Sequence, residues 1–392
     1  MKEAVILSGV RTPIGAFMGG LATLSAPRLG AAAIQAALER SGVAPDQVDE
    51  VLMGNVLSGG IGQAPARQAA IFAGLPESVP CTTINKVCGS GMKAVMMGAQ
   101  AIRCGDADIV VAGGMESMSQ APYALPKART GYRMGNGELV DLMIHDGLWD
   151  PYKNIHMGHA GELCSRECGI SRERQDDFAA ESYRRALAAQ ESCRFADEIV
   201  PVPVPQSKGD PVLVDKDEEP GRGNIEKLPS LRPAFDKEGV VTAGNASSIN
   251  DGGAALVLSS ADRAESLGLK PIAKIVAYSQ HAQAPEWFTT APASAIEKLL
   301  AKTGLSVGDI DLFEVNEAFS VVSLVVADKV GIPHEKMNVN GGAVALGHPI
   351  GMTGARLVLT LIHELRRRGG KRGIATPCIG GGEATAILVE IP

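Results

Sequence analysis

The sequence predicts an α/β fold made of two similar halves, and two observations carry this prediction. First, residues 33–56 (AIQAALERSGVAPDQVDEVLMGNV) align without a gap on residues 295–318 (AIEKLLAKTGLSVGDIDLFEVNEA). Second, the offset of 262 residues between Ala33 and Ala295 also places the glycine-rich loop at Cys88 opposite Ile350, beside His348. Chance similarity would explain one such pair of segments, whereas a duplicated α/β domain explains both.

Each copy of the repeat indicates an amphipathic helix, a glycine that ends it (Gly42 or Gly304), a short loop and a strand. In the first half a second helix is expected over residues 90–104, because its apolar residues share one face. Gly105 is expected to end this helix, and residues 107–114 (ADIVVAGG) are typical of a buried strand. In the second half residues 354–370 predict the matching helix, and residues 373–391 predict returning strands.

Between the halves the composition changes to proline, glycine and charged residues, as in residues 205–235 (PQSKGDPVLVDKDEEPGRGNIEKLPSLRPAF). One clear helix is expected there, over residues 171–190. Long insertions on a rigid α/β core often form lids or binding loops. The expected domains are therefore residues 1–119 with 250–271, an inserted loop domain over residues 120–249, and residues 272–392.

Composition and charge narrow the class of protein. Apolar residues make up 45% of the 392, which is typical of a globular chain, and the net charge of −7 disfavours nucleic acid and anionic membranes as partners. No stretch of about 18 uninterrupted apolar residues occurs, so no membrane span is expected. Seven cysteines, an odd number in a long chain, favour a reducing compartment. The first residues do not have the pattern of a signal peptide, and a cytoplasmic protein is expected.

Cys88 is the first candidate for chemistry, because it precedes two closely spaced glycines and a predicted helix in NKVCGSGMKAV. The N–H groups and the dipole at a helix N-terminus are expected to stabilise a thiolate and lower its pKa. The glycines would let a substrate carbonyl approach the backbone closely. The alternative, equally supported by this stretch alone, is a small, buried and inert cysteine.

His348 favours the first of these alternatives. It lies between Gly347 and Pro349 in NVNGGAVALGHPIGMTGAR, and a histidine is the usual base that activates a thiol. The spacing of Gly342 and Gly347 is that of a phosphate loop, but the lysine such a loop requires is replaced by His348, which excludes a nucleoside triphosphate site. A structural histidine remains the alternative.

Further candidates follow two predicted strands of the second half. In TPCIGGGEA, Cys378 precedes three glycines that begin at Gly380, and such turns expose N–H groups that can hold an oxyanion. A second thiol here indicates a second catalytic role or, alternatively, a disulfide with Cys88. In EVNEAF, Asn316 lies at a strand end, where an amide suits the orientation of a water molecule but is more often a turn residue.

A metal site is a weaker hypothesis for the segment IHMGHAGELCSREC. His156, His159, Cys164 and Cys168 are residue types that bind zinc. A helix would place the two cysteines on one face, but no second pair of cysteines follows. No metal is therefore expected.

Together these motifs resemble the thiolase family, and within it acetyl-CoA acetyltransferases of the biosynthetic type. The resemblance covers essentially the whole chain. It rests on RTPIGAF, NKVCGSGMKA, GGMESMSQAPY, HMG, LRPAFDKEGVVTAGNASSINDG, VNEAF, GHPIGMTGAR and CIGGGEA, in that order. It implies two α/β halves, each with a mixed five-stranded sheet, stacked in five αβαβα layers, with the insertion covering coenzyme A. It also implies a homodimer or a homotetramer built as a dimer of dimers.

The activity that the resemblance implies is acetyl-CoA C-acetyltransferase, a transferase of fatty acid metabolism. Two acetyl-CoA would condense reversibly to acetoacetyl-CoA and CoA through acetyl-Cys88, or a short-chain 3-ketoacyl-CoA would undergo thiolysis. In this assignment His348 is the activating base, and Cys378 removes the α-proton of the second acetyl-CoA. Asn316 holds a water that forms one oxyanion hole with His348, and the N–H groups of Cys88 and Gly380 form the other. No cofactor is implied, because the coenzyme A thioesters are substrates.

The resemblance also implies the residues that contact coenzyme A. They are Leu148, His156, Met157, Arg222, Lys227, Phe235, Ala243, Ser247, Ala318 and Phe319, of which Arg222 and Lys227 lie in a segment whose spacing departs from the family pattern. Near the acyl end, Trp287 and Phe288 stand where relatives commonly carry smaller residues. Their bulk favours acetyl over longer chains, unless they are a surface aromatic pair.

Two other functions are consistent with a cysteine nucleophile on this fold. A decarboxylating ketoacyl synthase would carry a second active-site histidine, or His and Asn, where this chain has Cys378. A non-catalytic acyl-CoA-binding protein would be expected to lack one of the four catalytic side chains, and here all four are present.

Overall fold

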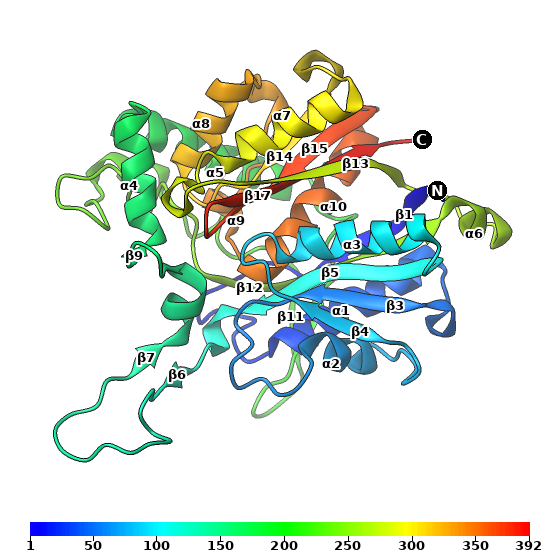
Figure 1. The fold of residues 1–392 in the computed structure, drawn as a ribbon, viewed down its shortest axis with the longest axis horizontal. Coiled ribbons are helices and arrows are strands. Elements are labelled where there is room, and N and C mark those ends of the chain that lie inside the picture. Colours follow the sequence, from blue (N-terminus) through cyan, green and yellow to red (C-terminus); the bar gives the residue numbers. More distant parts are fainter.

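The computed structural model describes residues 1–392, and its elements stack in five layers (Figure 1). The first half contains β1 (Ala4–Arg11), β2 (Gly15–Ala16), α1 (Ala26–Ser41), η1 (Pro45–Gln47), β3 (Glu50–Gly54), α2 (Pro65–Phe72), β4 (Cys81–Ile84), α3 (Ser90–Cys104), β5 (Ile109–Ser117), β12 (Asn250–Ser260) and α6 (Ala261–Ser266). The second contains β13 (Ala273–Ala282), η5 (Pro285–Trp287), α7 (Ala291–Thr303), η6 (Val307–Asp309), β14 (Leu312–Val315), α8 (Ser320–Val330), η7 (His334–Lys336), α9 (Ala343–Leu346), α10 (Ile350–Arg368), β15 (Arg372–Thr376), β16 (Cys378–Ile379) and β17 (Glu383–Glu390).

The insertion between β5 and β12 contains η2 (Met118–Gln120), β6 (Tyr123–Ala124), β7 (Val140–Asp141), η3 (Met143–Leu148), β8 (Trp149–Asp150), β9 (Ile155–His156), α4 (Met157–Glu167), α5 (Arg172–Glu191), β10 (Val202–Val204), β11 (Val212–Val214) and η4 (Ile225–Ser230). Two helices of three or more turns, α4 and α5, lie there, where the sequence predicted one. α4 was considered only as a helix that would place Cys164 and Cys168 on one face, because glycines interrupt its apolar pattern at Gly158 and Gly161.

The predicted mixed α/β architecture is confirmed, with two differences in the sheets. Helices α3 and α10 form the middle layer, with α1 and α2 outside one sheet and α7 and α8 outside the other. The strand order is β14-β15-β17-β13-β1-β12-β5-β3-β4, so the two sheets are hydrogen-bonded edge to edge where β1 meets β13. In the second half the fifth position is only a single bridge between Phe313 and Met337, instead of a full strand.

The internal repeat holds in three dimensions. The short turns η1 and η6 follow Gly42 and Gly304, which end α1 and α7 in the left-handed conformation. Just before the following strand, Asp49 accepts a hydrogen bond from the N–H of Ile109 (2.9 Å), and Asp311 accepts one from the N–H of Arg372 (2.8 Å). The same side chain therefore links neighbouring strands in each half.

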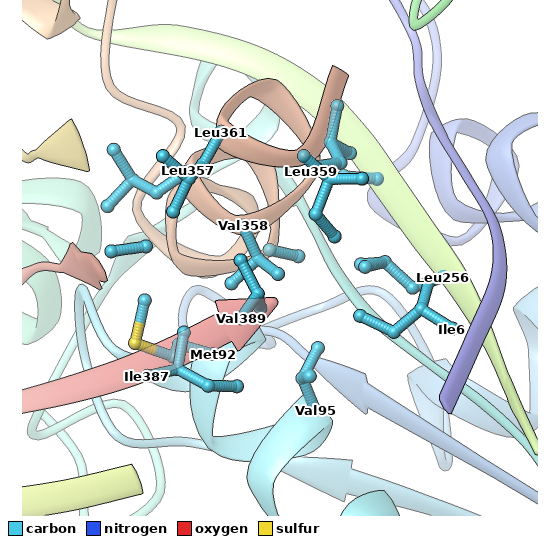
Figure 2. Close-up of a cluster of buried hydrophobic side chains, with 14 of the residues drawn as sticks. Ile6, Met92, Val95, Leu256, Leu357, Val358, Leu359, Leu361, Ile387 and Val389 are labelled. Carbon is cyan, nitrogen blue, oxygen red and sulfur yellow. The ribbon is translucent and has the colours of Figure 1, made fainter. Parts of the chain in front are cut away.

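The crossing of α3 and α10 brings the Cys88 and His348 loops together. The helices meet near their N-termini, where a Cβ on Gly91 would lie 2.9 Å from the N of Ala355, and one on Gly354 would lie 2.5 Å from the N of Met92. The helices pack on β17, β1 and β12 through Met92, Val95, Leu357 and Leu359, which lie in one cluster with Ile387 of β17 (Figure 2). Because both loops immediately precede these helices, the close crossing fixes the site.

The insertion is attached to the first half by a buried ion cluster. Arg11, the last residue of β1, donates to Glu198 Oε1 (2.7 Å) and to both carboxylate oxygens of Asp217 (2.6 and 2.9 Å). All three side chains are buried, and removing one partner from such a cluster typically costs about 3–5 kcal/mol. None of the helices combines the length and apolar character that crossing a membrane requires.

Candidate active site

A largely apolar cavity of about 250 Å³ lies where the two helix N-termini meet the insertion. Eleven of the predicted site residues line it: Cys88, Leu148, His156, Met157, Phe235, Ser247, Phe288, Ala318, Phe319, His348 and Gly380. Asn316 and Cys378 are fully buried beside it. The residues thus come from both halves and from the insertion, over more than 290 positions of the chain.

Cys88 is held immediately before α3 by a strained turn. Val87 has φ of 45°, a left-handed conformation that a β-branched residue rarely adopts and that costs about 1–3 kcal/mol. The N–H of Val87 donates to Asn85 Oδ1 (3.0 Å), and the hydroxyl of Ser90 donates to the carbonyl of Val87 (2.7 Å). These bonds maintain the turn, so that Cys88 is presented, half-buried, to the cavity.

The prediction that the helix N-terminus lowers the pKa of Cys88 is wrong. Burial raises the pKa of the thiol to about 11, although the N–H groups of Gly380 and of Cys88 itself act in the opposite direction. The carboxylate of Glu116 contributes to this rise. Desolvation therefore outweighs the helix terminus, and Cys88 is a neutral thiol near pH 7 that needs a base to become a nucleophile.

His348 is suited to be that base. Burial, and then the positive charge of Arg356, lower the pKa of His348 to about 3, so the imidazole is neutral near pH 7. Its Nδ1 lies 2.7 Å from the hydroxyl of Thr353, which donates its own proton to the carbonyl of Pro349 (2.8 Å). Nδ1 is therefore the protonated nitrogen, and Nε2 carries the lone pair that can accept a proton.

Asn316 completes the environment of this imidazole. Its Nδ2 lies 3.4 Å from His348 Nε2, consistent with Nε2 as the acceptor. Its Oδ1 is buried and has no hydrogen-bond partner in the protein. Because buried polar atoms almost always have a partner, this oxygen is suited to bind a water or a substrate group.

Cys378 lies close to Cys88. It begins β16, and Gly380–Gly382 then turn the chain into β17. Burial, followed by the nearby Cys88, raises the pKa of Cys378 well above its ordinary value. All seven cysteines are free, so the alternative of a disulfide between Cys88 and Cys378 is excluded in this structure.

The residues predicted to contact coenzyme A divide into two groups. Leu148, His156, Met157, Phe235, Ser247, Ala318 and Phe319 line the cavity, and Phe235 stacks on His156 with ring centroids 4.8 Å apart. Ala243, Arg222 and Lys227 do not line the cavity and are exposed. Their contact with coenzyme A remains a prediction about the surface of the insertion.

Sequence reasoning missed six residues of the cavity wall. They are Met118, Gly147, Ala246, Ser248, Ile249 and Ile350. Ile350 carried a signal, because the repeat aligned it with Cys88, whereas the others lie in loops without periodicity. Of the predicted aromatic pair, Phe288 is buried against the cavity and Trp287 is not part of its wall, so the pair is not simply a surface feature.

The segment IHMGHAGELCSREC, considered above as a zinc site, does not bring potential metal ligands together. No three histidine, cysteine, aspartate or glutamate side chains of the chain lie together in a metal-binding arrangement. Cys164 and Cys168 approach each other on α4 with their sulfur atoms 4.0 Å apart, whereas His156 and His159 pack on Phe235. That no metal binds elsewhere remains a prediction.

The pKa of Cys88 leads to a testable pH dependence. Because the thiolate is the reactive form, alkylation of Cys88 by iodoacetamide is expected to accelerate about tenfold per pH unit between roughly pH 6 and pH 9. Peptide mapping by mass spectrometry separates this reaction from alkylation of the exposed Cys104 and Cys193. A rate that levels off below about pH 8 would contradict the raised pKa.

Comparisons with known proteins place these features in context. The family model described as thiolase, N-terminal domain, matches residues 4–262, and that of thiolase, C-terminal domain, matches residues 269–391. A Pseudomonas aeruginosa acetyl-CoA acetyltransferase is 53% identical over 99% of both chains. The acetyl-CoA acetyltransferase 2 of Arabidopsis thaliana is 54% identical over 100% of this chain and 97% of its own. The crystal structure of the Bacillus anthracis acetyl-CoA acetyltransferase superposes with a TM-score of 0.98 at 44% identity, covering 100% of this chain and 99% of that one.

Proposed function

The chain belongs to the thiolase family, and from this premise we propose that it is an acetyl-CoA C-acetyltransferase that condenses two acetyl-CoA to acetoacetyl-CoA and CoA. The reverse reaction is thiolysis of a short-chain 3-ketoacyl-CoA. The observation that carries the proposal is the meeting of the Cys88 thiol, the Gly380 N–H and neutral His348 in one apolar cavity. Such a site can both form a thioester on the enzyme and stabilise the oxyanion of each step.

In the first half-reaction Cys88 takes the acetyl group. His348 Nε2 accepts the thiol proton, and the thiolate attacks the carbonyl carbon of acetyl-CoA. The oxyanion that forms there is stabilised by the N–H groups of Cys88 and Gly380, which already point at the sulfur. The sulfur of coenzyme A leaves and takes a proton from Cys378, which the raised pKa keeps in its thiol form until then.

In the second half-reaction the Cys378 thiolate removes the α-proton of another acetyl-CoA. A thiolate with a raised pKa is a stronger base than an ordinary one, which suits a weak carbon acid. The enolate oxygen is held by imidazolium His348 and by a water bound to Asn316. The carbanion then attacks acetyl-Cys88, and the released Cys88 thiolate recovers its proton from His348, so that the proton balance closes.

The size of the acyl group is limited by aromatic side chains. Phe288 packs on Phe319 with ring centroids 6.4 Å apart, and both line the cavity. A filled pocket rejects an extra methylene by about 10–200-fold in kcat/KM. The proposed function therefore predicts that acetoacetyl-CoA is the best substrate in a thiolysis assay across 3-ketoacyl-CoA chain lengths, and that Phe288→Ala raises kcat/KM for six-carbon substrates relative to four-carbon ones.

The neighbouring Trp287→Ala is the matched control, because Trp287 is an aromatic residue outside the cavity wall and is expected to leave this ratio unchanged. Wild-type preference for chains of eight or more carbons would refute the short-chain assignment.

We also propose a homotetramer assembled as a dimer of dimers. β4 and β14 are the two terminal strands of the sheet, and β14 has a bridge between Phe313 and Met337 on its outer edge. The edge of β4 is free, and such an edge favours pairing with another copy. The hairpin of β6 and β7 extends away from the body of the molecule (Figure 1) and exposes Tyr123, Leu125, Tyr132, Met134 and Leu139. Apolar side chains on a projecting arm support a role in contacts between dimers. A cytoplasmic location and a role in fatty acid metabolism remain predictions.

A further inference from the structure

Hydrogen bonds within the loop that carries Cys88 maintain its shape but do not connect it to the opposite half of the molecule. The Asn85, Val87 and Ser90 hydrogen bonds described above maintain its shape, and the N–H of Lys86 donates to Ser90 Oγ (2.8 Å). None of these bonds sets the distance from Cys88 to the opposite half of the molecule. The side chain of Lys86, in contrast, points out of the loop toward that half, where it meets Glu383.

The opposing loop carries the other reacting groups. Cys378 and Ile379 form β16, which pairs with the start of β17 in the register Cys378 with Ala384 and Ile379 with Glu383. Glu383 therefore marks the end of the three-glycine turn that presents the Gly380 N–H. A shift of this hairpin would move Cys378 and the Gly380 N–H together relative to Cys88.

The two loops meet without space between them. A Cβ on Gly89 would lie 2.3 Å from Ile379 Cδ1, so a larger residue at position 89 would require the Ile379 side chain to shift. Beside the contact, Lys86 Nζ forms an ion pair with Glu383 Oε2, across 297 positions of the chain. It is the one ion pair between the two loops, and the side chains of Lys86 and Glu383 are 20% and 36% exposed.

We propose that Lys86 and Glu383 are positioning residues of the catalytic reaction, and that their ion pair holds the Cys88 loop in register with the hairpin of Gly380 and Cys378. The inference rests on the proposed acetyl transfer. An ion pair this exposed contributes little to global stability, so its contribution is to geometry. Donors of an oxyanion hole must lie within hydrogen-bond distance of the developing oxyanion, and a displacement of about 1 Å can cost about 10²-fold in rate.

The test compares Lys86→Met, Glu383→Gln and the double variant in the full-length enzyme. Each single variant is expected to lower kcat for thiolysis of acetoacetyl-CoA about tenfold. KM for coenzyme A and the midpoint of thermal unfolding are expected to stay near wild type. The double variant is expected to lose no more than either single variant, because both remove the same contact.

Glu390→Gln is the matched control. Glu390 lies at the other end of β17 and pairs with Arg372 Nε at 2.7 Å, with side chains 27% and 31% exposed. This variant is expected to keep wild-type kcat. The proposal would be overturned if both Lys86→Met and Glu383→Gln kept wild-type kcat, or if their losses in kcat multiplied in the double variant. A loss of thermal stability without a loss of kcat would also overturn it.

Alkylation of Cys88 provides a readout that does not depend on acetyl transfer. If the pair positions the Gly380 N–H, both single variants are expected to slow alkylation at pH 9 about threefold, because a donor to the thiolate moves away. A purely electrostatic effect instead gives opposite signs, slower without Lys86 and faster without Glu383, and that outcome refutes positioning. If Cys88 of the wild-type enzyme is alkylated normally but no acetyl-enzyme forms, the proposed function is refuted. The alkylation rates of the variants would still test whether Lys86 and Glu383 position the Gly380 N–H.

Discussion

Replacement of Cys88 by serine is expected to abolish the acetyl-enzyme and to lower kcat for thiolysis by at least about 10⁴-fold. The reason is the chemistry of the nucleophile. His348 is a weak base, with a pKa of about 3, and it works on a thiol whose own pKa is about 11. A serine hydroxyl is far less acidic than this thiol, so the same imidazole cannot deprotonate it usefully. The measurement is incubation with radiolabelled acetyl-CoA, followed by acid quench and peptide mapping.

Cys164→Ser is the matched control, because Cys164 is a buried cysteine on α4 that does not line the cavity. This variant is expected to retain both the acetyl adduct and turnover. A radiolabelled adduct in the Cys88→Ser variant at any other residue would place the nucleophile elsewhere.

Replacement of Cys378 by alanine is expected to separate the two half-reactions. The variant is expected to form acetyl-Cys88, because Cys88, His348 and the Gly380 N–H remain in place. Acetylation is expected to be slower than in the wild type, because CoA must leave as a thiolate without a proton from Cys378. Condensation is expected to fall by about 10²–10⁴-fold, since the base that removes the α-proton is missing. The measurements are the stoichiometry of acetyl-Cys88 and the exchange of α-hydrogens of acetyl-CoA with deuterated solvent, which is expected to stop.

This variant also separates the thiolase reaction from the alternatives on the same fold. If Cys378→Ala condensed normally and consumed a malonyl thioester, the chain would be a decarboxylating synthase. If the wild-type chain bound acetoacetyl-CoA but did not cleave it with CoA, it would be a binding protein. If Cys378→Ala is inactive and shows no thermal unfolding transition, the variant is not folded. The same measurements are then made on Cys378→Ser, which keeps the volume of the side chain.

Local sequence predicted the parts of the fold that local forces determine. The helix before Gly42, the helix from Ser90 and the buried strand follow from periodicity and from glycine at helix ends. The strand was predicted over residues 107–114 and spans Ile109–Ser117. The repeat went further, because an offset shared by two segments implied that the Cys88 and His348 loops are equivalent ends of equivalent helices. Helix α4 was not among the clear predictions, because glycines break its pattern. The edge-to-edge joining of the sheets at β1 and β13 left no local signal.

In the candidate site, too, the sequence predicted some features and the tertiary structure decided others. Motifs identified Cys88, His348, Asn316 and Cys378 by residue type, and the family match agrees with the activity that they imply. The protonation state of these groups was not readable from the motifs. The sequence predicted a lowered pKa for Cys88, but burial raises it, because desolvation depends on every neighbour in space and the helix terminus is only one of them.

By itself, then, the sequence determined the family, the duplicated α/β plan and the residues able to react, since these depend on side-chain chemistry and on contacts within a few residues. The tertiary structure decided how those residues work. It set the proton of His348 on Nδ1 through Thr353, and it kept Cys88 and Cys378, the two cysteines of the candidate site, in the thiol form. It also joined Lys86 to Glu383 across 297 positions. Electrostatics and close packing act between atoms that are near in space, and only the folded chain specifies which atoms those are.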